Sequence, residues 1–381
     1  MEDPSARRKV LVVFGTRPEA IKMCPLVQEL QTRGGMETRV CVTGQHREML
    51  DQVLGIFGVV PDYDLAIMQP GQSLTDITVR VLRGLEQVLA AAAPDLVLVH
   101  GDTTTAFTAA LAAFYAKARV GHVEAGLRTY DIDSPYPEEF NREAISVVAR
   151  LNFSPTPRAA QNLRAQGVPE SRIFITGNTA IDALRTTVRA DYTSPITRWA
   201  AGCRLLVVTA HRRENLGAPM HEMFRAIRRI ADEYPDVRVV YPVHMNPEVE
   251  AIAKAELSDD DRIRLIEPLP ASEFHNLIAR SYFVLTDSGG IQEEAPSLDK
   301  PVLVMRDVTE RQEGVEAGVL RLVGTRQDSI YSACRTLLDD RAAYECMCRA
   351  PNPYGDGHAS QRIADAIEQY FTAMHAARQD T

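Results

Sequence analysis

Short apolar runs alternate with amphipathic, helix-like stretches along the whole chain. The runs Lys9–Phe14 (KVLVVF) and Asp95–His100 (DLVLVH) predict buried strands, and residues 18–32 and 73–92 have the spacing of amphipathic helices. Further elements are expected at residues 39–43, 119–123, 151–154 and 172–175 as strands, and at 103–117 as a helix. Apolar strands with helices between them are typical of a parallel sheet that is covered on both faces. The first half of the chain therefore predicts one doubly wound parallel sheet.

The alternation begins again after a polar stretch that contains Pro195 and Trp199, the only tryptophan of the chain. The run Arg204–Thr209 (RLLVVT) predicts the first strand of a second sheet, with further strands at residues 237–241, 263–266, 282–286 and 302–304. We therefore expect an α/β protein of two Rossmann-like doubly wound parallel-sheet domains, residues 1–185 and 203–358, with a ligand-binding cleft between them. A last helix at residues 359–381 is expected to pack back on the N-terminal domain.

Length, composition and charge narrow the class of protein. The 381 residues are too many for one ordinary core, and 45% hydrophobic and 24% charged residues are close to globular averages. The net charge of −9 is spread along the chain and argues against nucleic acid or an anionic membrane as a partner. No apolar run reaches the ~18 residues of a membrane span, and the polar N-terminus fits no signal peptide, so we expect a cytoplasmic protein. The six cysteines lack paired zinc spacing, which predicts reduced thiols and no metal.

Polar residues follow the predicted strands of the first domain, where ligands of such sheets bind. Arg17 and Lys22 come after the first strand, in a turn that lacks the GxGxxG dinucleotide fingerprint. Asp102 follows the predicted strand at residues 95–100, Glu124 follows the one at 119–123, and Glu138 lies in the long loop after Glu124. A helix N-cap is the alternative role for Asp102, and solvated helix-start charges are the alternative for the two cations. If the three acids lie at one wall of the cleft, their negative charges make their pKa values differ. One of them can then serve as an acid and another as a base.

The second domain supplies the opposite charge. His211, Arg212 and Arg213 directly follow its first strand, and cations at a strand end of an acidic chain indicate an anion such as a diphosphate. Ser288-Gly289-Gly290 opens a helix after a later strand and leaves backbone N–H groups for a phosphate. Glu294, about one turn further on, has a carboxylate for ribose hydroxyls. These strand ends together predict a phosphate-binding site.

The motifs resemble those of one known family. In chain order they are GTRPEAIKM, GQHREMLDQVL, HGDTTT, VEAGLRT, PEEFNRE, GNTAIDAL, TAHRREN, TDSGGIQEEAPSL, KPVLVMRD and NPYGDGHAS, between about Val10 and Ile367. They resemble the non-hydrolysing UDP-N-acetylglucosamine 2-epimerases. The resemblance implies a GT-B-like fold and reversible epimerisation of UDP-GlcNAc to UDP-ManNAc at C2, by elimination of UDP to 2-acetamidoglucal and re-addition. It also implies a UDP-sugar as the partner, no cofactor, and a homodimer.

The resemblance further implies roles for individual residues. Asp102, Glu124 and Glu138 match the family's acid/base carboxylates, and His211 matches its catalytic histidine. The substrate-binding residues implied are Arg17, Lys22, Arg142, Ser288, Gly289, Gly290, Glu294 and Arg311. Some members bind a second UDP-GlcNAc as an allosteric activator, and the residues that match this site are Gln45, His46, Arg212 and His244.

The chain departs from the family pattern at a few positions. Tyr136 and Phe140 stand where the family has Trp and Ala, which predicts a reshaped loop on the sugar side. Gln312 and Asp299 replace a usual Pro and Gly, and residues 68–72 lack an arginine that allosteric members carry. These departures bear on the activator site and on sugar specificity, whereas the catalytic motifs are intact.

Other functions stay open at this point. A GT-B glycosyltransferase would share the fold and the diphosphate site, but it needs an acceptor groove and no base at C2. A hydrolysing epimerase would release free ManNAc, and a UDP-sugar sensor would have no need of the carboxylates. A 4-epimerase would need NAD and its glycine fingerprint. The intact carboxylates favour the 2-epimerase.

Overall fold

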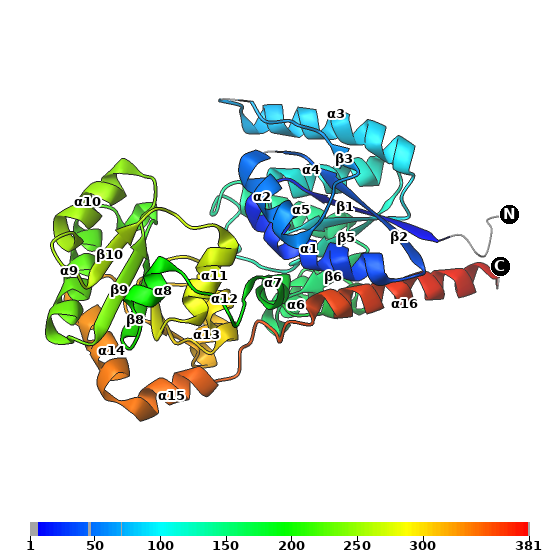
Figure 1. Cartoon of the computed structure of the whole chain (residues 1–381). Coiled ribbons are helices and arrows are strands. Elements are labelled where there is room, and N and C mark those ends of the chain that lie inside the picture. Colours follow the sequence, from blue (N-terminus) through cyan, green and yellow to red (C-terminus); the bar gives the residue numbers. More distant parts are fainter. Residues whose placement is uncertain (1–6, 45–46, 70, 380–381) are drawn as a thin grey trace. The chain divides into compact units, whose positions relative to one another are not determined.

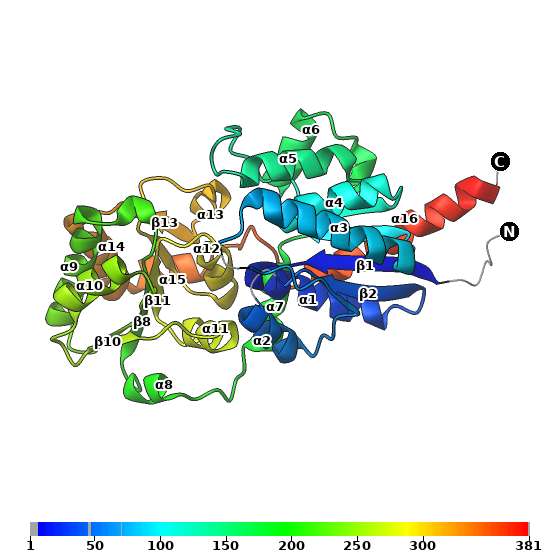
Figure 2. The same cartoon turned by 90° about the horizontal axis from the view of Figure 1, so that it is seen from above.

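The computed structural model describes residues 7–44, 47–69 and 71–379, and the chain divides into two compact units. Unit 1 runs up to Ala183 and resumes at Gly355, and unit 2 is Leu184–Tyr354. In each unit a parallel sheet lies between layers of helices (Figures 1 and 2). The predicted fold class, two Rossmann-like parallel-sheet domains, is confirmed.

The described residues of unit 1 form a sheet with the strand order β3-β2-β1-β4-β5-β6-β7, in which all pairs are parallel. The strands are β1 (Arg8–Phe14), β2 (Met36–Val42), β3 (Tyr63–Asp64), β4 (Leu96–His100), β5 (Arg119–Val123), β6 (Leu151–Ser154) and β7 (Ile173–Ile175). The helices are α1 (Arg17–Thr32), α2 (Arg47–Phe57), α3 (Leu74–Ala92), α4 (Thr104–Tyr115), α5 (Glu138–Val148), α6 (Pro157–Ala165), α7 (Thr179–Thr187, which continues into unit 2) and α16 (Ala359–Gln379).

Burial on both faces explains why the strands of unit 1 are apolar throughout. Val12 and Phe14 of β1 pack in a cluster with residues of α1, α2 and α16. Leu11 and Val13, which point to the other face, pack in a cluster with residues of α3 and α4. Successive strand residues face opposite layers, so a strand between two helical layers needs an apolar side chain at every position.

The last helix, α16, lies along α1, the first helix of the chain (Figure 1). Ile363, Ile367 and Phe371 of α16 are buried in the same cluster as α1. The start of α16 is fixed by the buried carboxylate of Asp182, which accepts hydrogen bonds from the backbone N–H groups of Ala359 (3.1 Å) and Ser360 (2.7 Å). Side-chain acceptors of this kind satisfy the free N–H groups of a helix start.

Unit 2, all of which the structure describes, has a six-stranded parallel sheet of order β10-β9-β8-β11-β12-β13. Its strands are β8 (Arg204–Thr209), β9 (Val237–Pro242), β10 (Ile263–Ile266), β11 (Phe283–Thr286), β12 (Val302–Val304) and β13 (Leu320–Leu322). Its helices are α8 (Pro195–Trp199), α9 (Ala218–Glu233), α10 (Pro247–Leu257), α11 (Ala271–Ala279), α12 (Ile291–Glu294), α13 (Gln312–Glu316), α14 (Gln327–Asp339) and α15 (Arg341–Arg349).

The polar stretch before β8 carries one short helix, α8. Trp199 at its end packs against an apolar cluster of unit 2, and the Arg264 guanidinium lies 4.4 Å from the centroid of its ring. The edge strands β3 and β13 have two and three residues and were not predicted, because each contains a charged residue and neither forms a continuous apolar run.

Each sheet has one point where the strand order reverses, between β1 and β4 in unit 1 and between β8 and β11 in unit 2. The loops that follow these strands are where open α/β sheets bind ligands. In the described part of the chain, no helix combines the length and apolar character that a membrane span requires.

Candidate active site

Glu124 follows β5 in a strained turn of unit 1. Its backbone has a left-handed φ of +63°, which residues other than glycine rarely adopt. Its carboxylate pairs with Lys22 Nζ of α1 and accepts a hydrogen bond from Asn178 Nδ2 (3.3 Å). Strain of this kind clusters at functional sites. The structure therefore brings together two predicted residues, Lys22 and Glu124, at the carboxyl end of the sheet.

Asp102 follows β4 and is not the N-cap of α4. That position is taken by Thr103, whose Oγ1 accepts from the N–H of Ala106 (3.0 Å). The Asp102 carboxylate pairs with Arg142 Nη2 of α5, and its backbone carbonyl accepts from Asn141 Nδ2 (2.8 Å). The N-cap alternative for Asp102 is thus wrong, and a second predicted pair, Asp102 and Arg142, lies together.

Burial raises the pKa of the Asp102 carboxyl above its ordinary value. The positive charge of Arg142 opposes this change, and the negative charges of Glu124 and Glu138 reinforce it. A raised pKa at one carboxyl group of a cluster is one way in which an acid and a base are made from one residue type. The interaction also places Glu138, the partly exposed first residue of α5, within electrostatic reach of Asp102.

A buried carboxylate, Glu19, joins the turns after β1 and β4. It accepts from the backbone N–H groups of Gly15 (3.0 Å) and Thr16 (2.8 Å) and from the hydroxyl of Thr103 (2.7 Å), next to Asp102. Thr16 and Glu19 have the spacing of a capping box, so the hydrogen bonds of Glu19 within its own turn can be recognised in the sequence. Its bond to Thr103 depends on the pairing of β1 with β4.

Two buried histidines near these carboxylates are neutral at pH 7. Burial lowers the pKa of His122 to about 3, and its Nε2–H donates to Gly101 O (2.7 Å). Burial also lowers the pKa of His100 to about 4, and its Nε2 lies 3.9 Å from Glu124 Oε2. The positive charge next to Glu124 therefore comes from Lys22.

Arg17 is the first, partly exposed residue of α1. The loop between β5 and α5 carries the exposed Tyr136 (69%), and Phe140 in α5 packs edge-to-face on Phe107, with ring centroids 5.5 Å apart. These positions, at which the chain departs from the family pattern, therefore lie on the side of the sheet where the carboxylates lie.

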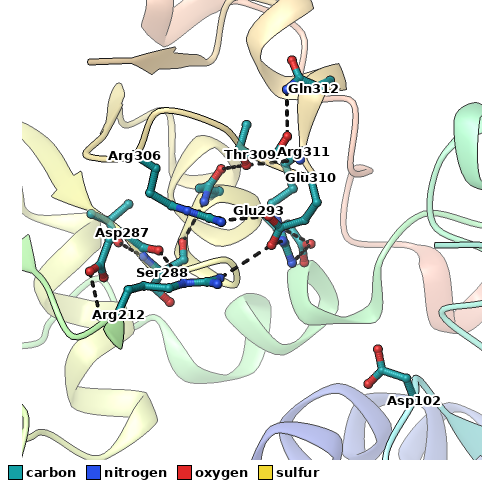
Figure 3. A network of polar contacts seen from close by, with 12 residues as sticks. Asp102, Arg212, Asp287, Ser288, Glu293, Arg306, Thr309, Glu310, Arg311 and Gln312 are labelled. Carbon is teal, nitrogen blue, oxygen red and sulfur yellow. Dashed lines mark hydrogen bonds and ion pairs between the residues drawn. The ribbon is translucent and has the colours of Figure 1, made fainter. Parts of the chain in front are cut away.

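In unit 2, the fully buried carboxylate of Asp287 organises the strand ends (Figure 3). It accepts from the backbone N–H groups of His211 (2.9 Å) and Arg212 (2.9 Å) and from Asn215 Nδ2 (3.0 Å). Asp287 follows β11 and its partners follow β8, so one acid fixes both loops at the point where the strand order reverses. The sequence motif contained Asp287, but nothing in the pattern indicated that it is a positioning group.

The His211 ring stacks on His244, with centroids 5.5 Å apart and an interplanar angle of 13°. Burial lowers the pKa of His211, and His244 and Arg212 act in the same direction, whereas Asp287 opposes them. His211 Nδ1 lies 3.4 Å from Asp287 Oδ1. The stacking and the contact with Asp287 hold the ring at the strand end.

Arginines surround the Ser288-Gly289-Gly290 turn (Figure 3). Arg311 donates through Nε to Glu293 Oε1 (2.8 Å), and its guanidinium lies so close to Gly289 that a Cβ there would be 2.8 Å from Nη1. Arg306 Nη1 donates to Glu310 (2.9 Å), which also pairs with Arg311. Burial acts to raise the pKa of Glu310, but Arg311 and Arg306 outweigh it and hold that pKa at about 2.

Glu294, the residue predicted to contact ribose, ends α12 with its carboxylate 3.6 Å from Nε2 of the buried His275. The N–H of Ser288 donates to Thr286 Oγ1 (2.9 Å) at the start of the glycine turn. The predicted phosphate-site residues therefore share one edge of the sheet of unit 2. Sequence reasoning missed the acids that hold them, Glu293 and Glu310, because neither follows a strand directly.

Of the four predicted allosteric residues, Gln45 and His46 lie outside the described residues. Arg212 and His244 lie at the strand ends of unit 2, and their allosteric role stays a prediction. No group of three or more His, Cys, Asp or Glu side chains in the described ranges could hold a metal ion.

Comparisons with known proteins place the chain in a family. The family model described as "UDP-N-acetylglucosamine 2-epimerase" matches residues 28–368. The UDP-N-acetylglucosamine 2-epimerase of Bacillus subtilis is 55% identical over 359 residues, which is 94% of either chain. A structure of S. aureus MnaA with UDP has a TM-score of 0.89 at 50% identity and covers 96% of this chain and 97% of that one. The UDP-GlcNAc 2-epimerase of Neisseria meningitidis, solved with UDP-GlcNAc bound, has a TM-score of 0.86 at 46% identity, over 95% of this chain and 100% of that one.

The motif order, the two parallel sheets and these matches agree over nearly the whole chain. The protein belongs to the UDP-N-acetylglucosamine 2-epimerase family.

Proposed function

We propose that this enzyme interconverts UDP-GlcNAc and UDP-ManNAc by removing and returning the proton at C2 of the sugar. The observation that carries the proposal is the division of charge between the units. Unit 1 collects the carboxylates Asp102 and Glu124, each beside a cation, and unit 2 collects arginines, His211 and a glycine turn against which Arg311 lies. The ligands of the related structures, UDP and UDP-GlcNAc, support the choice of substrate.

The chemistry explains why both sets of groups are needed. The C2 proton of a 2-acetamido sugar has no adjacent carbonyl, so direct abstraction is very slow. If the C1–O bond breaks first, UDP leaves with the electron pair and the C2 proton becomes acidic. A carboxylate takes this proton, and the C1=C2 double bond of 2-acetamidoglucal forms. Return of a proton to the opposite face of C2, with attack of a UDP oxygen on C1, gives the epimer without net oxidation.

The residues divide between these steps. Asp102, Glu124 and Glu138 are the proposed proton carriers. More than one of them is needed, because the proton leaves from one face of C2 and returns to the opposite face. His211, Arg311 and the N–H groups of Gly289 and Gly290 are proposed to stabilise the negative charge that develops on the diphosphate. Arg17, Lys22 and Arg142 are the proposed cations of the sugar side, and Glu294 is the proposed ribose contact.

We also propose that the enzyme is a homodimer that pairs through one face of unit 1. Phe114 (56%), Tyr115 (65%) and Val147 (81%) are large apolar side chains exposed on α4 and α5. Tyr115 lines both a hollow of about 910 Å³ against α3 and one of about 620 Å³ that reaches α5. Contiguous apolar surface of this kind commonly marks an interaction site.

The first experiment incubates the purified protein with UDP-GlcNAc in D₂O without added cofactor and follows the reaction by proton NMR. We expect UDP-ManNAc to appear and the C2 proton signal to disappear as deuterium enters. Free ManNAc and UDP would instead identify a hydrolysing enzyme. No new sugar and no exchange would overturn the proposed activity on UDP-GlcNAc, and would favour a transferase or a sensor.

Asp102→Asn and Glu124→Gln should each lower kcat by roughly 10²- to 10⁴-fold, because a proton carrier is lost. The affinity for UDP, measured by calorimetry, should change little, since its proposed partners lie in unit 2. Asp261→Asn, at an exposed carboxylate of unit 2, is the control and should keep full activity. Near-normal turnover of either site variant would refute the acid/base assignment.

Gly289→Ala should weaken UDP binding by about tenfold or more, because the new Cβ would lie 2.8 Å from Arg311 Nη1 and displace the guanidinium. Gly34→Ala is the matched control, since a Cβ at Gly34 meets no atom within 4 Å. Titration calorimetry with UDP measures both variants. Equal affinities would show that the glycine turn does not take part in UDP binding.

Tyr115→Arg should shift the protein toward the monomer in sedimentation velocity, because it places a charge in the proposed apolar interface. Val60→Arg, at an apolar side chain of unit 1 that is 80% exposed, provides the control. A wild-type protein that sediments as a monomer, or a Tyr115→Arg variant that stays dimeric, would contradict the proposed interface.

A further inference from the structure

Glu139 follows directly after the proposed proton carrier Glu138, yet its environment is very different. Glu138 is partly exposed, whereas Glu139 is fully buried. A buried carboxylate is costly unless hydrogen bonds and cations satisfy it. The groups that satisfy Glu139 therefore indicate what it does.

The two oxygens of Glu139 contact different parts of unit 1. Oε1 accepts from the backbone N–H groups of Thr129 (2.9 Å) and Tyr130 (3.0 Å), in the loop that follows Glu124. Oε2 lies 3.1 Å from Nη1 of Arg142, one helical turn further along α5. The other terminal nitrogen of Arg142, Nη2, pairs with Asp102. One guanidinium thus bridges a buried acid and a proposed proton carrier.

The bridge is more than a helix-surface ion pair. Exposed pairs three residues apart stabilise a helix only weakly. Here the Arg142 side chain is 11% exposed and the Glu139 side chain 0%, and two backbone N–H groups fix the acid. Asn141 of the same turn also holds the Asp102 carbonyl (2.8 Å). The first turn of α5 therefore fixes Asp102 through its carboxylate and its backbone.

We propose that Glu139 is a positioning residue of the epimerase reaction, which orients Arg142 on Asp102 and shares its positive charge. This inference rests on the proposed function of Asp102 as a proton carrier. Glu139 itself does not touch the substrate, because its carboxylate is enclosed by α5 and the loop after β5.

Sharing of the guanidinium has a consequence for proton transfer. The charged groups that face Asp102 are Arg142 and Glu138 from α5 and Glu124 from the loop after β5. Arg142 lowers the pKa of Asp102, whereas burial and the two acids raise it. Removal of the Glu139 charge would leave Asp102 as the partner of Arg142 in this bridge, so the pKa of Asp102 would fall. Whichever limb of the pH profile belongs to Asp102 would then move to lower pH.

The test compares Glu139→Gln with Glu143→Gln, which removes the same charge one turn later on α5, where Glu143 accepts from Gln166 (3.1 Å). Rates with UDP-GlcNAc are measured between about pH 5 and about pH 9. For Glu139→Gln we expect kcat to fall about tenfold and the Asp102 limb to move down by about one pH unit, with KM changed less than about threefold. Glu143→Gln should match the wild type.

A second pair of measurements separates this inference from the proposed function. Carboxyl-carbon NMR of Asp102 should show a lower pKa in Glu139→Gln than in the wild type, whether or not the wild type epimerises UDP-GlcNAc. Glu139→Asp keeps the charge and should restore the position of the pH limb. If Glu139→Gln loses thermal stability but keeps the wild-type pH profile and Asp102 pKa, the role of Glu139 is only structural and the proposal is wrong.

Discussion

The strands of both sheets lie between layers of helices and must be apolar, so polar side chains are found at the ends of the strands. In unit 1 the order reverses between β1 and β4, and Lys22 and Asp102 follow these strands. In unit 2 it reverses between β8 and β11, which His211 and Ser288 follow. Parallel strands bring these ends to one edge of each sheet. The concentration of charge at two edges is therefore a consequence of burying the rest of the strands.

Buried acids do the positioning at both edges. Glu19 joins the turns after β1 and β4, Asp287 joins the loops after β8 and β11, and Glu139 joins α5 to the loop after β5. A carboxylate accepts several hydrogen bonds at once, so one side chain can hold two loops that share no backbone ladder. Each of these carboxyl groups accepts hydrogen bonds from backbone N–H groups, and Glu139 also lies beside a guanidinium, so the loops are tied together and the groups attached to them are held in place.

Much of this arrangement could be predicted because it depends on local pattern. The apolar runs located the main strands to within three residues, and the position of polar residues after them indicated both edges. Asp102, Glu124, His211 and the glycine turn were found in this way. The short strands β3 (Tyr-Asp) and β13 (Leu-Arg-Leu) were not, because a polar residue interrupts each, whereas the equally short edge strand β7 (Ile-Phe-Ile) is apolar throughout.

Partners across the fold depend on tertiary structure. Glu138 and Glu139 are neighbours of the same residue type, and the sequence by itself determined only that an acidic pair lies in a long loop after a strand, whereas in the structure this pair opens helix α5. Successive residues of a helix point about 100° apart, so the docking of α5 decided that Glu139 is buried beside Arg142 and that Glu138 stays partly exposed. The sequence likewise determined the cations and the glycine turn of unit 2. Only the packing of chain segments far apart in sequence decided that Arg311 rests on Gly289 and that Asp287 holds His211, because contacts between distant segments leave no periodic signal in either one.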